Sequence, residues 1–79
     1  MSTVQLKVKN LISEGIEVIL EPWGENYGLP GKGGTLAVEL SGETSEAFEI
    51  VVDNRQSSLR IELWAPTGAL LTRIDTGGA

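Results

Sequence analysis

Three aromatic side chains are the clearest candidates for a binding site in this sequence. Trp23 and Tyr27 lie in the segment EPWGENYGLPG, residues 21–31, and Trp64 ends an alternating run that also carries Arg60. Aromatic rings anchor protein interfaces and stack on sugars, and an arginine guanidinium stacks on an aromatic face. We therefore take Trp23, Tyr27, Arg60 and Trp64 as candidate interaction residues.

Two interpretations stay open for residues 21–31. In the first, the prolines and glycines of the segment form a corner, and the rings of Trp23 and Tyr27 cover one end of a core. In the second, one ring is exposed as a platform for a sugar, a peptide or a protein. The segment therefore predicts either a packed lid or a binding surface.

Trp64 is expected to point away from the core, because it lies on the strand face opposite Leu59, Ile61 and Leu63. An outward tryptophan requires a cover, which a turn, the stacked Arg60 side chain or another chain would supply. Further apolar residues on nominally outward faces would either join Trp64 in an interface patch or lie under loops. These residues are Ile19, Val51 and Leu70 or Leu71.

The side chains most used in catalysis are missing from this chain of 79 residues, which contains neither cysteine nor histidine. Paired carboxylates can hydrolyse glycosides or bind Ca²⁺. The spacing of Glu14, Glu17, Glu21 and Glu25 fits neither pattern, so we expect them on the solvated surface. Residues 29–35 lack the Gly-Lys-Ser/Thr order of a phosphate loop. We predict no catalytic residue, no cofactor and no metal site.

Charge and hydropathy exclude two classes of partner. The formal net charge of −5 argues against binding to nucleic acid or to anionic lipid, both of which require a basic face. No apolar run approaches the ~18 residues of a membrane span, and residues 1–10 do not resemble a secretion signal. We therefore expect a soluble, cytoplasmic protein.

Period-two alternation of apolar and polar residues dominates the chain, as in half-buried strands. With turn residues about every ten positions, it predicts an all-β fold, a small antiparallel β-sandwich or barrel of six to seven strands. We expect one domain over residues 1–79, with residues 75–79 as a disordered tail. The predicted strands are residues 3–9, 16–21, 35–40, 47–52, 58–64 and 69–74.

Two details of this strand pattern can be tested directly. In the fourth predicted strand, Phe48, Ile50 and Val52 are expected to face the core. If the first two strands form a hairpin, their apolar faces match when Val8 lies opposite Ile16. If the two strands belong to different sheets of a sandwich, that pairing does not exist.

Residues 18–25 read VILEPWGE and are followed by Tyr27, Leu29, Pro30-Gly31 and the run TLAV at residues 35–38. This pattern resembles a group of small bacterial β-proteins that share EPWGE-x-Y-x-L-x-x-G before a strand. The resemblance spans roughly residues 4–64 and is specific between Leu20 and Val38. It implies a shared β-fold and carries no activity. Where those proteins often read Pro-Pro-Gly-Glu, this chain has Pro30-Gly31-Lys32-Gly33, which reverses the charge.

From these observations we expect a non-catalytic protein–protein interaction or assembly module, with a protein partner or self-association. A carbohydrate-binding module that uses exposed aromatic rings is the first alternative. A phage or viral structural accessory protein is the second. An enzyme is the least expected class, because its mechanism would rest on carboxylates, one tyrosine and hydroxyl groups alone.

Overall fold

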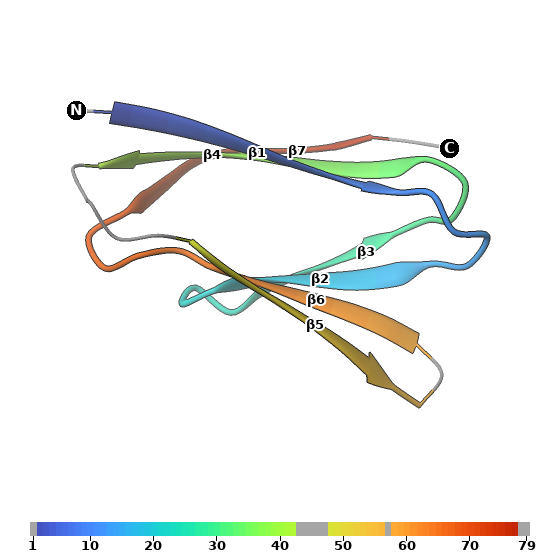
Figure 1. The fold of residues 1–79 in the computed structure, drawn as a ribbon. Coiled ribbons are helices and arrows are strands. Elements are labelled where there is room, and N and C mark those ends of the chain that lie inside the picture. Colours follow the sequence, from blue (N-terminus) through green and yellow to red (C-terminus); the bar gives the residue numbers. More distant parts are fainter. Residues whose placement is uncertain (1, 43–47, 57, 78–79) are drawn as a thin grey trace.

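The computed structural model describes residues 2–42, 48–56 and 58–77, which form two stacked β-sheets (Figure 1). This arrangement confirms the predicted small all-β sandwich, and no closed barrel is formed by the described residues. The seven strands are β1 (Ser2–Asn10), β2 (Ile16–Glu21), β3 (Glu25–Leu29), β4 (Gly34–Gly42), β5 (Glu49–Arg55), β6 (Ser58–Trp64) and β7 (Leu70–Gly77).

One sheet has three strands in the order β1-β4-β7, and the other has four in the order β3-β2-β6-β5. All neighbours are antiparallel except β2 and β6, which are parallel. Of the two alternatives for the first two strands, the structure shows the second: they do not form a hairpin, because Val8 lies opposite Leu36 and β2 belongs to the other sheet. Alternation determines which face of a strand is buried, but it does not determine the neighbouring strand.

The core lies between the inner faces of the two sheets. Val18, Leu20, Leu29 and Leu36 are almost completely buried there. Burying a side chain of this size stabilises the fold by about 1.5–3 kcal/mol. These residues come from β2, β3 and β4, so the best-packed part of the sandwich lies where β4 crosses the β2–β3 pair.

The segment of residues 21–31 contains a strand that the alternation did not reveal. Gly24 closes a tight turn, in which its backbone N–H donates to the carbonyl of Leu20 at 2.8 Å and its φ is 71°. The peptide bond between Glu21 and Pro22 is cis. The chain then returns along β2 as β3, which places Tyr27 opposite Val18.

Asn10 joins the two loops at one end of the sandwich and is only 3% exposed. Its side-chain Nδ2 donates to the carbonyl oxygens of Glu14 (2.8 Å), Leu29 (3.2 Å) and Pro30 (3.1 Å). Its Oδ1 accepts from the backbone N–H of Ile12 at 3.1 Å. Asn10 therefore satisfies backbone groups of both the β1–β2 loop and the β3–β4 turn.

The same junction requires glycine at position 31. A Cβ atom there would lie 2.3 Å from the carbonyl oxygen of Ser13, a distance that real Cβ atoms do not reach. The β3–β4 turn consequently packs directly on the backbone of the β1–β2 loop. This packing and the Asn10 hydrogen bonds hold β2 and β4 in their two layers.

Strand β7 extends to Gly77, so residues 75–77 belong to the three-stranded sheet and the prediction of a tail there is wrong. Residues 78 and 79 lie outside the described part of the chain. Asp75 lies opposite Ala37 and Gly77 opposite Thr35. Polar residues at the end of a chain do not indicate a tail when an antiparallel neighbour can satisfy their backbone groups.

The prediction that Phe48, Ile50 and Val52 face the core is only partly correct. Ile50 and Val52 lie opposite Leu63 and Ile61, on the inner side of the sheet. They are nevertheless 59% and 61% exposed. Strand β5 is the fourth strand of its sheet and the facing sheet has only three, so these two side chains have no layer above them.

Candidate functional site on the outer face of the four-stranded sheet

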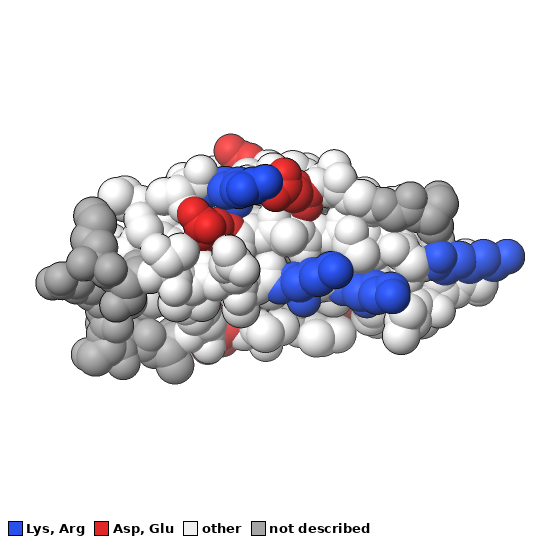
Figure 2. Space-filling view, turned by 90° about the horizontal axis from the view of Figure 1, so that it is seen from above, with Lys and Arg blue, Asp and Glu red and all other residues white. Residues whose placement is uncertain are grey.

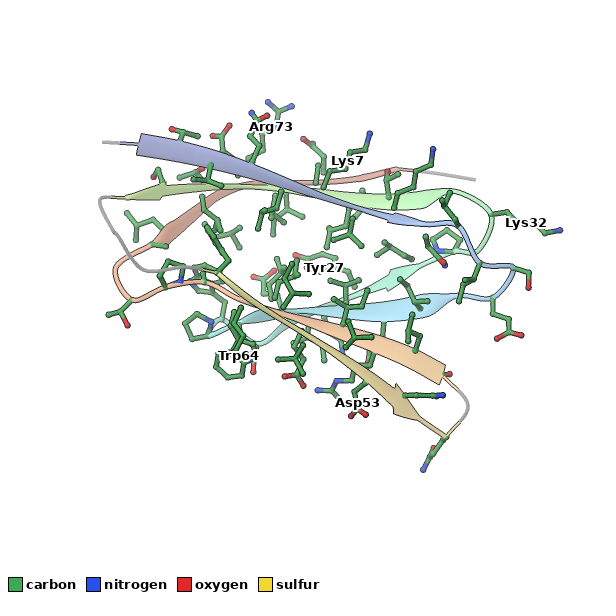
Figure 3. All side chains as sticks on the ribbon, viewed as in Figure 1. Lys7, Tyr27, Lys32, Asp53, Trp64 and Arg73 are labelled. Carbon is green, nitrogen blue, oxygen red and sulfur yellow. The ribbon has the colours of Figure 1, made fainter. Side chains whose placement is uncertain are left out.

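Trp64 lies on the outer face of the four-stranded sheet, at the end of β6 (Figure 3). Its neighbour Leu63 points into the core, and Trp64 is 38% exposed. The indole Nε1 donates a hydrogen bond to Oε1 of Glu62 at 3.0 Å. The ring is therefore half-exposed and held in one orientation, as an anchor residue of an interface needs to be.

Arg60 lies on the same face and contacts two carboxylates. Its Nε is 3.5 Å from Oε2 of Glu62 and 3.9 Å from Oε1 of Glu17. The amide Nδ2 of Asn26 donates to the other oxygen of Glu17 at 2.9 Å. A continuous polar row thus crosses the sheet from β3 through β2 to β6 and reaches Trp64 through Glu62.

The row lies over an apolar residue. Ile19 points outward from β2 between Asn26 and Glu62, its partners on the neighbouring strands, and is only 6% exposed. Half-exposed ion pairs contribute little to stability, typically 0–1 kcal/mol. We infer that the row mainly covers Ile19 and orients Trp64.

The predicted apolar patch around Trp64 does not form. Ile19 is covered, and Val51 on this face is half-buried. Leu70 is exposed but lies opposite Ser41 on the outer face of the other sheet, and Leu71 turns inward opposite Leu40. The pattern correctly assigned outward faces, but the outward faces of two different sheets do not meet.

Trp23 and Tyr27 lie apart from Trp64, on the core side. Both are half-buried and pack against the central cluster of apolar residues. Trp23 lines a cavity of about 10 Å³ together with Leu20 and Leu63. The packing agrees with the lid interpretation of residues 21–31. The four candidate residues therefore form two groups, with Arg60 and Trp64 on one surface.

The hydroxyl of Tyr27 donates a hydrogen bond to Oε2 of Glu25 on the same strand. This bond raises the pKa of the Tyr27 phenol above its ordinary value of 10.0, and burial and the charge of Glu25 act in the same direction. The hydroxyl thus remains protonated at neutral pH and serves as a donor.

Two of the four glutamates considered above, Glu17 and Glu25, lie apart and form no common carboxylate site. Glu17 lies on the outer face beside Arg60, whereas Glu25 lies on β3 beside the Tyr27 hydroxyl. Among the described residues, no group of three acidic side chains is placed to hold a metal ion. That part of the chain also includes no helix long and apolar enough to cross a membrane.

No protein-family model, curated protein or solved structure that was compared with this chain matches it. The resemblance of residues 20–38 to small bacterial β-proteins stays a prediction. The fold and the outer face define the chain as a two-sheet β-sandwich with one oriented, half-exposed tryptophan.

Three further residues of this surface, Glu62, Glu17 and Asn26, were not among the candidate interaction residues. Glu62 shares a face with Arg60 and Trp64, because residues two apart in a strand point the same way, so this signal was available. Glu17 and Asn26 were not predictable, because they reach Arg60 only through the β2–β6 and β2–β3 pairings.

Proposed function

We propose that this chain is a non-catalytic protein–protein interaction or assembly module that binds through its β5–β6 side. The observation that carries the proposal is the exposure of three large apolar side chains there. Trp64 is 38% exposed on the outer face, and Ile50 and Val52 are 59% and 61% exposed beside the edge of β5 that no described strand pairs with. Exposed apolar groups that adjoin a free edge are typical of binding surfaces.

Two features make Trp64 the central residue of this surface. Its ring is oriented by Glu62, so binding costs little side-chain entropy. Strand β5 places Glu49 directly opposite it, and the acidic residues around the ring favour a partner with basic groups at the rim. Tryptophan is among the residues most enriched at interface hot spots.

Carbohydrate binding is the weaker candidate. A sugar platform in the segment of residues 21–31 would need an exposed ring of Trp23 or Tyr27, and both pack against the core. Sugar binding would therefore rest on Trp64 alone. A structural accessory role in a phage or virus is one form of the proposed assembly function, and the resemblance to bacterial β-proteins supports a bacterial source.

A capture experiment with matched variants tests the proposal. Wild-type chain, Trp64→Ala and Leu11→Ala would be immobilised and exposed to host lysate, and the retained proteins quantified by mass spectrometry. Leu11 is the control because it is an exposed apolar residue in the β1–β2 loop, away from Trp64. We expect a partner that binds wild type and Leu11→Ala and binds Trp64→Ala at least about tenfold less.

Two results would contradict the proposal. One is that no protein is retained by the wild type above the level of a blank surface. The other is that every retained protein binds Trp64→Ala as well as the wild type. Circular dichroism of each variant shows whether a loss of binding reflects a loss of fold.

A further inference from the structure

Three glutamates flank Trp64 on the outer face of the four-stranded sheet. Glu62 lies two residues before Trp64 on the same face of β6 and accepts the hydrogen bond from its indole Nε1 at 3.0 Å. Glu49 on β5 and Glu21 on β2 lie directly opposite Trp64 on the two neighbouring strands. Neighbouring strands are about 4.8 Å apart, so both carboxylates can reach a group placed over the indole ring.

Two of these glutamates have no basic partner among the described residues. Glu62 is paired with Arg60, whose Nε is 3.5 Å from Oε2 of Glu62. Neither Glu21 nor Glu49 forms an ion pair with another described residue. Glu49 is exposed, and the half-buried Glu21 has its carboxylate beside Gly24, which has no side chain to cover it. Two accessible, unpaired carboxylates therefore lie on either side of the Trp64 strand.

The other basic residues of the chain lie away from this pair. The three-stranded sheet carries Lys7, Lys9 and Arg73 on its outer face, where Figure 2 shows basic side chains. In Figure 3, Lys7 and Arg73 point away from the side of the molecule that carries Trp64. Lys32 lies in the β3–β4 turn, and Arg55 and Glu49 are the two ends of β5, about 20 Å apart in an extended strand.

The hydrogen bond of Trp64 determines what its ring offers to a partner. The indole N–H is already donated to Glu62, so the exposed part of the ring offers its π face. The face of an aromatic ring is negative and attracts cations, and tryptophan attracts them most strongly. A carboxylate bound to the indole N–H adds to this negative potential. The ring and the unpaired carboxylates therefore favour the same kind of ligand, a cation.

We propose that Trp64, Glu49 and Glu21 form a recognition site for a basic side chain of the partner, a lysine or arginine that stacks on the indole face. This inference rests on the proposed interaction function and names the group of the partner that enters its central position. The charged end of that side chain lies over the ring, between the two carboxylates. Val51, half-buried on the same face opposite Glu62, offers an apolar contact to its aliphatic stem.

Other ligand classes fit the site less well. An acidic group would meet unpaired carboxylates of the same charge, which is costly in an interface. A sugar hydroxyl would find no free indole N–H to accept. A purely apolar side chain would cover the ring but leave Glu21 and Glu49 desolvated without a partner, and unpaired buried charges oppose binding. A cation is the group that satisfies both the ring and its neighbours.

The test is an NMR titration of the indole N–H signals with three peptides that differ only in their middle residue. The probes are acetyl-Gly-Xaa-Gly-amide with lysine, arginine or norleucine in the middle. The chain has two tryptophans, and Trp64→Phe identifies the Trp64 signal by its loss. Exposed cation–π contacts and ion pairs are individually weak, so the lysine and arginine peptides should shift this signal with a Kd of about 1–30 mM. The norleucine peptide, which lacks the charge, should bind at least about tenfold more weakly.

Neutral variants and salt test the part played by the carboxylates. Glu49→Gln and Glu21→Gln keep the size of the side chain and should each weaken binding of the lysine peptide about two- to fivefold. The matched control Glu14→Gln changes an exposed glutamate of the β1–β2 loop, at the other end of β2 from Trp64, and should leave binding unchanged. Circular dichroism checks the fold of each variant. Raising NaCl from about 50 mM to about 500 mM should weaken binding to the wild type itself, where no variant has to fold.

Three results would overturn the inference. One is a Trp64 signal that responds to neither the lysine nor the arginine peptide. Another is a norleucine peptide that binds as tightly as the lysine peptide, and the third is lysine binding that neither the glutamine variants nor salt weaken. None of them decides the proposed function. A chain that still captures a partner through Trp64 keeps that function, whereas a chain that binds the lysine peptide but captures no partner keeps the site and loses the function.

Discussion

Replacement of Asn10 by alanine tests whether one buried amide holds two loops of the sandwich together. The side chain is 3% exposed, and its Nδ2 and Oδ1 serve backbone groups at Ile12, Glu14, Leu29 and Pro30. An amide has two N–H groups, so the three carbonyl oxygens share two donors. Alanine would leave these backbone groups without that partner.

The expected loss follows from counting these bonds. Two donated hydrogen bonds and one accepted bond, at about 0.5–1.5 kcal/mol each, give a loss of about 1.5–4.5 kcal/mol. A chain of 79 residues is expected to have an unfolding free energy of about 4–12 kcal/mol. The Asn10→Ala variant should therefore lose a large fraction of its stability and unfold at much lower urea concentration.

Urea unfolding followed by tryptophan fluorescence measures this difference. Asn26→Ala is the control, because Asn26 is an exposed asparagine with one side-chain bond, to Glu17, and should cost under about 0.5 kcal/mol. In Asn10→Asp a carboxylate would face the three carbonyl oxygens, so that variant should be relatively more stable at about pH 4, where it is protonated. An Asn10→Ala midpoint equal to that of Asn26→Ala would refute the reasoning.

Two further predictions concern the aromatic residues. Trp23→Ala should lower the unfolding free energy by about 3–5 kcal/mol because Trp23 packs against the core; a loss below about 0.5 kcal/mol in urea unfolding would show that the ring is not packed. Tyr27 is the only tyrosine, so phenolate absorbance near 295 nm reports it alone, and its titration midpoint should lie above 10.0. Because the folded-state pKa is raised, its contribution to stability is present below about pH 10 and declines as pH rises through the folded pKa, and Tyr27→Phe should remove this decline.

Alternation predicted most of the strands because each sheet has one buried face. Leu36, Val38 and Leu40 show this in β4, where every second residue is buried. Strand β3 was missed because it reads Glu-Asn-Tyr-Gly-Leu, in which Gly28 and two polar residues interrupt the pattern. Its strand conformation depends on pairing with β2, and that is a tertiary effect.

The candidate site was predictable only within single strands. Arg60 and Trp64 are four residues apart in one strand, and this even spacing correctly assigned them to one outward face. The parallel pairing of β2 with β6 brings Glu17 to Arg60, and the sequences of the two strands do not indicate that they pair. The exposure of Ile50 and Val52 depends on the number of strands in the facing sheet, so their apolar character predicted the face but not the burial.

The parallel pair β2–β6 also has a consequence for the order in which the chain folds. Among the described strands, only the pairs β2–β3 and β5–β6 join strands that are neighbours in sequence, whereas Val18 on β2 pairs with Ile61 on β6. Contacts between residues far apart in sequence require closure of long loops and slow the folding of β-proteins. During synthesis, strand β2 can pair with β6 only after residues 58–64 have left the ribosome. The β2–β3 hairpin can therefore form early, but the four-stranded sheet closes only after β6 has been synthesised.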